Sequence, residues 1–398
     1  MAHSTTERLD DGFVQNPYAV YQRLRAEGPV SRVMMPGGHA VWVVTRHAEA
    51  RAALADPRLI KDWRALWPGE AAAELDDGFA ALDTHMLSTD PPDHDRLRRL
   101  VTKAFTARRI ERLRPRVAEI TRSLLDTMPA DGPVDLLESF AFPLPITVIC
   151  ELLGVPDADR PNFRTWTQAI LSTGAAAAES GTAAVEMAGY FTALVADKRA
   201  HPADDLLSAL IVARDAGDGL SQRELLGMIF LLLVAGHETT VNLIGTGTLA
   251  LLQSPGELAR LRADSALLPG AVEELLRYTS PVNHATFRFT AEAVEIGGTL
   301  IPAREAVLVA IASANRDPDR YLAPDRLDLG RDTGGHLAFG HGIHYCLGAP
   351  LARMEGEIAF GELFGRFPGM TLAVPAESLR WRPSTLIRGL EALPVRLS

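Results

Sequence analysis

The sequence predicts a mainly α-helical protein with small β-sheets, folded around one large core. Most of the 398-residue chain has apolar side chains at helical spacing, whereas β-branched runs are few and short. Hydrophobic residues make up 47% of the chain and charged residues 23%, so a sizeable core is expected. Neither an internal repeat nor a polar linker divides the sequence, which predicts a single domain over residues 1–398.

Pro and Gly residues separate the expected elements. Helical periodicity is found in Asn16–Ala26, Pro92–Phe105, Ala107–Met128, Leu144–Leu153, Ser221–Leu252 and Leu268–Tyr278. The expected strands are a weak one near the C-terminus and the runs Val41–Thr45, Val294–Ile296 and Ala306–Val309. Residues Ser172–Ala184 are nearly all Ala, Gly, Ser and Thr. This composition predicts either a weakly held helix or a mobile connection that could act as a lid.

Charge and cysteine content limit the location and the partners. The net charge of −10 argues against nucleic acid and against an anionic membrane surface. The first 13 residues have no apolar run, so no signal peptide is expected. Leu225–Leu252 is long enough to span a bilayer, but the polar side chains in its middle favour a buried helix. Two cysteines give no disulfide framework, and we expect a cytoplasmic monomer.

The segment around Cys346 carries the most information about function. Gly340 and Gly342 predict a tight loop, and helical periodicity begins at Leu347. Cys346 is therefore expected at a helix N-terminus, where the helix dipole and the free backbone amides favour a thiolate. Such a thiolate suits axial ligation of haem iron. Cys150, in contrast, lies in an apolar run and is expected to be a small buried side chain.

A zinc site is the alternative for this segment, because several possible ligands are clustered in it. Zinc sites usually combine such a group with a second, distant pair of ligands, and no second cysteine is nearby. The candidate zinc ligands are His336, His341, His344 and Cys346.

This segment resembles the signature of the cytochrome P-450 family. The pattern Phe-Gly-x-Gly-x-His-x-Cys-x-Gly is complete, and it is formed by Phe339, Gly340, Gly342, His344, Cys346 and Gly348. The resemblance extends over nearly the whole chain and is strongest to soluble bacterial macrolide and polyketide hydroxylases. It implies a prism-like, mostly helical fold, haem b with Cys346 as the iron ligand, and monooxygenase activity. Phe339, Gly340 and Gly348 are expected at the cofactor.

A second motif interrupts the long apolar helix with an acid next to an alcohol, Glu238 and Thr239. The motif is open to two interpretations. The threonine can hydrogen-bond back to a carbonyl one turn earlier, which makes the motif a polar kink. Alternatively, a carboxylate relays protons from solvent and the alcohol passes them to dioxygen in a dry pocket. The resemblance favours this catalytic role, and it places Ala235 and Gly236 beside the haem, with Gly236 leaving room for oxygen.

Haem propionates need cationic or hydrogen-bonding partners when they are buried. His94 and Arg98 are four residues apart and share one face of a helix, although a solvated helix face has the same pattern. The resemblance assigns His94, Arg98, Arg288 and His344 to the propionates.

Glu274 and Arg277 also match the family. The resemblance implies that they form a buried structural network with a later arginine, which we expect to be Arg326.

The source of electrons is predicted from a basic stretch. Residues 96–116 contain nine Lys or Arg residues and one acid, Glu111, in a chain that is acidic overall. Such a stretch is usually a solvated helix face. Here it follows the expected propionate-binding helix, and it suits electrostatic docking of an acidic donor protein. Because the chain has no flavin-binding glycine motif, a ferredoxin with its reductase is the expected electron supply.

The expected substrate is a bulky apolar small molecule, a macrolide or a similar polyketide. The alternatives are a peroxide-driven or oxygen-independent haem-thiolate enzyme and a haem-thiolate sensor or binding protein. An intact acid–alcohol pair disfavours the first alternative, and the absence of a signalling domain in the sequence disfavours the second. The expected pocket is lined by Met86, Leu87, Ile170, Leu232, Ala235, Val282 and Leu386, with Ser88, Asn283 and His284 as orienting polar groups.

Overall fold

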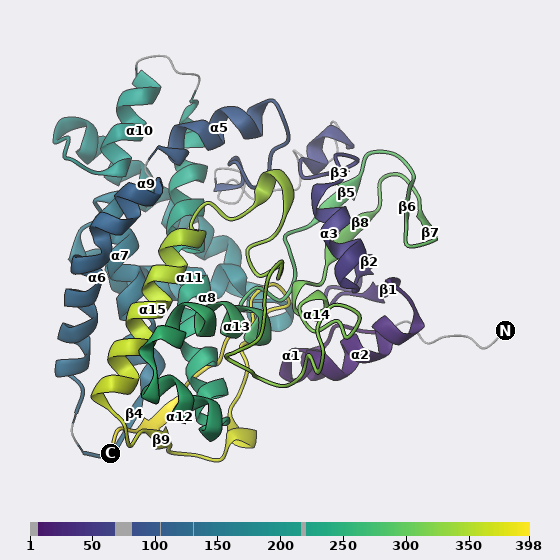
Figure 1. The fold of residues 1–398 in the computed structure, drawn as a ribbon. Helices are drawn as coiled ribbons and strands as arrows, with labels where there is room; N and C mark the ends of the chain where they lie inside the picture. Colours follow the sequence, from purple (N-terminus) through teal and green to yellow (C-terminus); the bar gives the residue numbers. More distant parts are fainter. Residues whose placement is uncertain (1–6, 68–81, 104, 130, 216–219) are drawn as a thin grey trace.

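The structure is a computed structural model, and it describes residues 7–67, 82–103, 105–129, 131–215 and 220–398. Most helices gather in one large body, whereas the largest sheet lies beside them with the N-terminal helices (Figure 1). The mainly helical fold with small sheets is thus confirmed. The helices of the body are α5 (Asp93–Thr102), α6 (Ala107–Asp126), α7 (Pro143–Leu153), α8 (Arg160–Leu171), α9 (Ser180–Ala200), α10 (Leu206–Asp215), α11 (Gln222–Leu252), α12 (Pro255–Ala263), α13 (Leu268–Thr279) and α15 (Ala349–Arg366).

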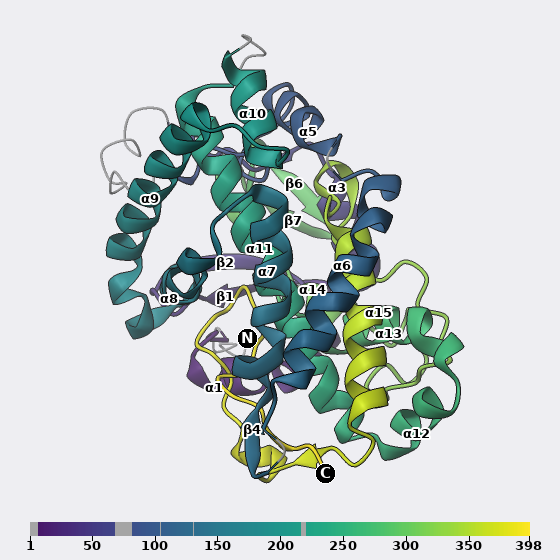
Figure 2. The same ribbon diagram turned by 90° about the vertical axis from the view of Figure 1, so that its left-hand side faces the viewer.

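Helix α11 is the centre of this body. It packs against α7, α13 and α15, and it is surrounded by other helices when the molecule is turned (Figure 2). Its first turn has a capping box, in which Ser221 accepts a hydrogen bond from the Glu224 amide and Glu224 accepts one from the Ser221 amide. α11 is long and apolar enough to cross a membrane, but 78% of its apolar window is buried, as expected of a core helix.

The five-stranded sheet brings distant segments together. Its order is β1 (Val30–Met34), β2 (Ala40–Val44), β8 (Ala306–Val309), β5 (Arg288–Thr290) and β3 (Leu59–Ile60). β2 and β8 are parallel, and the other neighbours are antiparallel. The register of β3 against β5 pairs Leu59 with Thr290, so the residues just after β3 lie close to the start of β5. Helices α1 (Asp11–Gln15), α2 (Pro17–Glu27), α3 (His47–Ala55) and α14 (Ile311–Ala314) lie with this sheet (Figure 1).

The remaining strands form two small sheets. β4 (Pro133–Asp135), β10 (Pro394–Arg396) and β9 (Thr371–Leu372) form an antiparallel sheet near the C-terminus. β6 (Val294–Ile296) and β7 (Thr299–Ile301) form a separate hairpin.

The sequence predictions of the regular elements are largely confirmed. All six expected helices are present, and the three internal strands are β2, β6 and β8. Within Ser172–Ala184, a 3₁₀ helix at Gly174–Glu179 leads directly into α9, so the helical alternative is correct for this stretch.

The expected ion-pair network contains a different arginine. Arg277 and Glu274 are fully buried and form two hydrogen bonds of 2.7 and 2.8 Å. The third member is Arg331, whose Nε lies 3.2 Å from the Glu274 carboxylate. Arg326, which was predicted for this position, is exposed and pairs with Asp328 instead. The prediction was wrong because the chain turns after Arg326 and directs the later arginine inward.

Candidate functional site

The loop before α15 holds Cys346 in a defined position. The Cys346 amide donates a hydrogen bond of 2.9 Å to the Phe339 carbonyl, which closes the loop. Gly340 and Gly342 have φ values of 72° and 76°, a left-handed conformation that favours glycine. A Cβ atom at Gly342 would lie 2.9 Å from the Leu54 carbonyl oxygen, so this glycine also permits close approach to α3.

Cys346 itself is accessible on one side, and α15 begins three residues later at Ala349. On its other sides the protein encloses the sulfur. This burial raises the pKa of the Cys346 thiol, while hydrogen bonds from the Gly348 and Ala349 amides and the charge of Arg98 act in the opposite direction. The amides at the helix start thus act toward the thiolate, as predicted, whereas burial opposes it. A metal cation bound to the sulfur would favour the thiolate over the thiol.

Four predicted anion ligands meet near this loop although they lie far apart in the sequence. The rings of His94 and His344 are 4.5 Å apart. Arg98 donates a hydrogen bond of 2.7 Å to the Tyr345 carbonyl, which joins α5 to the loop. Arg288, buried at the start of β5, donates one of 3.2 Å to the Leu59 carbonyl.

Three atoms of this group are buried and have no hydrogen-bond partner among the described residues. They are the Nε2 atoms of His94 and His344 and the Nε atom of Arg288. Buried polar groups are almost always satisfied, so unsatisfied polar atoms concentrated in one place indicate a binding site for a polar ligand. Because the surrounding side chains are cationic, that ligand is expected to be an anion.

Lys61 is a further basic side chain at this place, and the sequence analysis did not assign it to the site. Its Nζ atom is buried and donates hydrogen bonds to the Thr286 and Phe287 carbonyls, at 3.0 and 2.6 Å. Burial, together with the charge of Arg288, lowers the pKa of Lys61 well below its ordinary value. A single lysine after a short strand belongs to no motif, and only the pairing of β3 with β5 brings it here.

One face of α11 is open in the middle of an otherwise buried helix. Ala235 is exposed and Thr239 is half-buried, whereas Leu232, His237 and Glu238 are buried. The Thr239 hydroxyl donates a hydrogen bond of 3.0 Å to the Ala235 carbonyl one turn earlier, as in the polar-kink interpretation. Its oxygen can still accept a hydrogen bond from a molecule bound at this face.

Gly236 lies where α11 packs against α7. A Cβ atom at this position would lie 2.7 Å from Cγ1 of Ile149, a residue of α7. The missing side chain therefore permits close packing of α11 against α7. The expected place of Gly236 beside the cofactor stays a prediction.

The Glu238 carboxylate is buried and has charged and polar neighbours. Arg382, from the C-terminal part of the chain, forms an ion pair and a hydrogen bond with Oε1. Asn242 donates to the same oxygen at 3.1 Å, and His237 Nε2 lies 3.9 Å from Oε2. Burial alone would raise the pKa of Glu238, but these neighbours, Arg382 above all, hold it below its ordinary value. The sequence analysis missed Arg382, since no motif contains it.

The possible zinc ligands do not converge. His336 Nε2 lies 3.0 Å from the Glu273 carboxylate, to which Arg353 also donates hydrogen bonds, whereas His344 contacts His94. Although burial alone would raise it, the hydrogen bonds from His336 and Arg353 lower the pKa of Glu273 to about 2. In the part of the chain that the structure describes, no three His, Cys, Asp or Glu residues are arranged to hold a metal ion. The zinc alternative is therefore rejected for these residues.

The basic stretch is partly neutralised by acids from other helices. Arg96 pairs with Asp93 of its own helix and with Glu224 of α11, and the second pair was not visible in the local sequence. Arg114 and Arg116 likewise pair with Glu357 and Glu151. Four arginines of α5 and α6 are exposed and make no ion pair with any described residue, namely Arg99, Arg108, Arg109 and Arg112.

Comparison with known proteins identifies the family. Residues 193–371 match the cytochrome P450 family. The chain is 54% identical over 391 residues to the cytochrome P450 monooxygenase PikC of Streptomyces venezuelae, covering 98% of this chain and 92% of the relative. The chain belongs to the cytochrome P450 family. It is also 43% identical over 392 residues to the polyketide biosynthesis cytochrome P450 PksS of Bacillus subtilis, covering 97% of both chains.

A solved structure is similar over the whole fold. The tirandamycin C-bound P450 monooxygenase TamI superposes with a TM-score of 0.94 at 54% identity, covering 98% of this chain and all of that one. Because such relatives extend over nearly the full length, this P450 is a monooxygenase of the same family.

The residues of this P450 fit a haem. A haem-thiolate site requires three features: a sulfur that can form a thiolate, cationic partners for two carboxylates, and an open helix face. Here Cys346 is accessible, and α11 is open at Ala235. The Nε2 atoms of His94 and His344 and the Nε atom of Arg288 have no hydrogen-bond partner among the described residues. An iron–thiolate haem cofactor is implied by the family and agrees with this donor set.

The predicted polar groups of the substrate pocket are already engaged. Asn283 accepts a hydrogen bond of 2.9 Å from the Tyr21 hydroxyl, and His284 Nδ1 lies 2.7 Å from the Thr385 carbonyl. The Ser88 hydroxyl donates to the Asp83 carbonyl at 2.5 Å. These three side chains hold loops together, so the prediction that they orient the substrate is corrected.

Proposed function

We propose that this P450 inserts one atom of dioxygen into an unreactive C–H or C=C bond of a bulky apolar small molecule, a polyketide such as a macrolide. The observation that carries the proposal is the presence of the Cys346 loop and an intact acid–alcohol pair, Glu238 and Thr239, in one chain. The substrate class is supported by two relatives: PksS is a polyketide biosynthesis P450, and TamI binds tirandamycin C. We further propose that residues 1–398 work as a single domain and as a monomer in the cytoplasm.

Each site residue has a proposed role. Bound haem b supplies the iron that activates dioxygen, with electrons delivered from outside the chain. Cys346 binds the iron as a thiolate, in a loop shaped by Phe339, Gly340 and Gly348. The propionates are bound by His94, Arg98, Arg288 and His344, of which the two arginines supply the positive charge and the histidines supply hydrogen bonds. Ala235 leaves the face of α11 open because its side chain is small.

Proton supply is the proposed task of Glu238 and Thr239. Glu238 is buried and ionised, so it can take a proton from solvent and release it again. The hydroxyl of the next residue, Thr239, lies on the open face of α11. It can accept a proton from the Glu238 side and pass one to dioxygen.

The substrate class is tested by binding. Buried apolar area contributes roughly 25 cal/mol per Å², so large apolar ligands are expected to bind more tightly than small or polar ones. In a spectral titration of the haem-loaded protein, macrolides should displace water from the iron at lower concentrations than size-matched, heavily hydroxylated compounds. Displacement by small polar compounds but not by macrolides would show that the proposed substrate class is wrong.

The remaining alternatives are separated by the electron source. Formation of a hydroxylated product with NAD(P)H and a surrogate ferredoxin system supports the monooxygenase proposal. Product formation with peroxide alone would favour the peroxide-driven enzyme, and binding without turnover under either condition would favour a sensor.

We propose that a ferredoxin, reduced by its reductase, docks on α5 and α6. The exposed arginines Arg99, Arg108 and Arg109 are close to the helix that carries His94 and Arg98, and they can steer an acidic protein toward the cysteine side of the haem.

Replacement of Arg99, Arg108 and Arg109 by Gln should raise the apparent KM for ferredoxin several-fold and weaken its dependence on salt. Substrate affinity should not change, because these side chains are exposed. The matched control replaces Arg304, Arg380 and Arg396, three exposed arginines elsewhere on the surface. Equal effects of the two triple variants would indicate a general charge effect and contradict docking at α5 and α6.

A further inference from the structure

A hairpin in the C-terminal part of the chain lies against the centre of α11. Trp381 and Leu390 form an isolated antiparallel bridge, and the Arg382 amide donates a hydrogen bond of 2.9 Å to the Gly389 carbonyl. A Cβ atom at Gly389 would lie 1.9 Å from Oδ1 of Asn242, so the hairpin can approach α11 this closely only with glycine here. The backbone that carries Arg382 is therefore fixed one helical turn from Glu238.

Arg382 lies between the Glu238 carboxylate and solvent. Its side chain is 15% exposed, whereas that of Glu238 is 4% exposed. Both Arg382 and Asn242 interact with Oε1 of Glu238, whereas Oε2 lies 3.9 Å from His237 Nε2. A proton that arrives from the side of the hairpin meets Arg382 before it meets the carboxylate.

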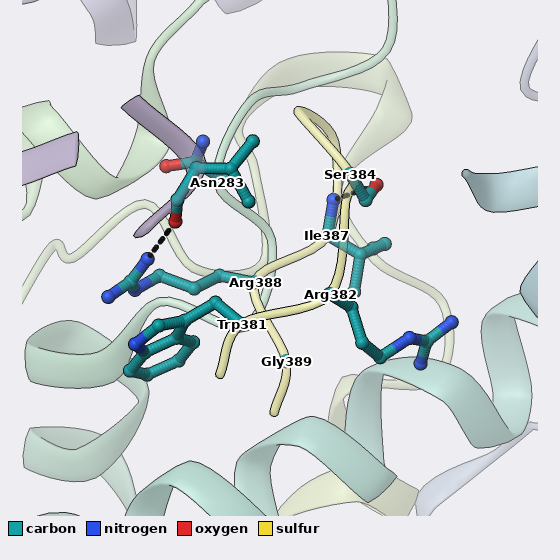
Figure 3. A pocket seen from close by; sticks show the side chains of 8 residues that line it. Asn283, Trp381, Arg382, Ser384, Ile387, Arg388 and Gly389 are labelled. Carbon is teal, nitrogen blue, oxygen red and sulfur yellow. Dashed lines mark hydrogen bonds between the residues drawn. The ribbon is translucent and has the colours of Figure 1, made fainter. Parts of the chain in front are cut away.

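A narrow recess leads to this arginine. It is lined by Val14, Asn283, Trp381, Arg382, Ser384, Ile387, Arg388 and Gly389. Figure 3 shows that the Arg382 side chain extends away from Trp381 and Arg388, toward the helix below the hairpin. The recess has no room for a water molecule in this conformation.

We propose that Arg382 is the gate of a proton route to Glu238, positioning the carboxylate when it is paired and opening the recess to water when it leaves. This inference rests on the proposed relay role of Glu238. In the closed state, Arg382 holds Glu238 ionised and blocks water. In the open state, a hydronium ion or water in the recess gives a proton to Glu238, which can pass it to Thr239, and the return of Arg382 closes the route.

The electrostatics agree with such a gate. The described groups that act most strongly on Glu238 are Arg382, from the hairpin, and His237, from α11 itself. Burial lowers the pKa of His237, and the charge of Arg382 lowers it further, so His237 favours its neutral form while Arg382 is in place. When Arg382 moves away, burial dominates and raises the pKa of the Glu238 carboxyl, which favours uptake of a proton.

The state of Glu238 can be measured by infrared spectroscopy on the haem-loaded protein, without turnover. In the R382M variant, a protonated-carboxyl band should appear at pH 7 and disappear in the R382M/E238Q double variant. Loss of one nearby charge should increase the protonated fraction at least about tenfold, which corresponds to one pKa unit. The conservative R382K variant should restore the ionised form. R380M, which changes an exposed arginine of the same segment, should match the natural protein.

Turnover provides the second measurement. R382M should release several-fold more peroxide per NAD(P)H than the natural protein, because proton supply is no longer gated. Its pH profile should also change. R382K should restore both the peroxide ratio and the pH profile. Absence of the carboxyl band in R382M, or an unchanged peroxide ratio, overturns the gate. If E238Q alone leaves the peroxide ratio and product yield unchanged, the relay role of Glu238 fails instead, whatever the infrared spectrum of R382M shows.

Discussion

A Cys346→His variant is expected to lose at least about 100-fold in monooxygenase activity, which corresponds to ~2.7 kcal/mol in the activation barrier. The thiolate donates electron density that promotes cleavage of the O–O bond, and a neutral imidazole donates less. The loop geometry depends on the Cys346 amide and on Gly340 and Gly342, so the variant should still fold. The reduced protein with carbon monoxide reports the ligand directly, because its Soret band should move from the thiolate position to the imidazole position.

Cys150 provides the control for this experiment. It is fully buried in α7, and burial raises the pKa of its thiol to about 12, so it is expected to remain an inert thiol. Cys150→Ala should leave the Soret band in place. If that variant moves the band, or if Cys346→His does not, Cys346 is not the iron ligand.

An Arg277→Met variant is expected to destabilise the fold by about 3–5 kcal/mol, because it leaves the buried Glu274 carboxylate without its main partner. Arg277 also donates hydrogen bonds of 2.9 Å to the Asn315 and Pro324 carbonyls, which would lose their donor. Arg331, at 3.2 Å from Glu274, remains but makes only one contact with it. Urea unfolding followed by circular dichroism, with haem content measured in parallel, provides the test.

The matched control is another Glu-x-x-Arg pair in the same chain, Glu257 and Arg260 of α12. Its arginine side chain is 48% exposed, whereas that of Arg277 is 0% exposed. Arg260→Met should change the unfolding midpoint little, since water replaces the partner of an exposed charge. Similar midpoints for the two variants would contradict a structural role of the buried network.

The sequence predicted the elements well where a local pattern determines them. Helix α11 has a capping box at its start and apolar residues throughout, and both signals are contained within its own residues. The Cys346 loop was likewise predictable, because its glycines adopt conformations that few other residues tolerate.

Features that depend on distant segments were missed or misassigned. Arg382 reaches Glu238 from 144 positions further along the chain, and Lys61 reaches the carbonyls of residues 286 and 287 through strand pairing. The sequence likewise does not show that Ile149 lies against Gly236. A family resemblance identifies the residues of a motif, but it does not show which neighbours their side chains contact in this chain.

The ion pair between Arg96 and Glu224 connects two helices with different tasks. Arg96 belongs to α5, which carries His94 and Arg98, whereas Glu224 belongs to the capping box that begins α11. One side chain therefore fastens the helix of two expected haem ligands directly to the first turn of the helix that contains Glu238 and Thr239.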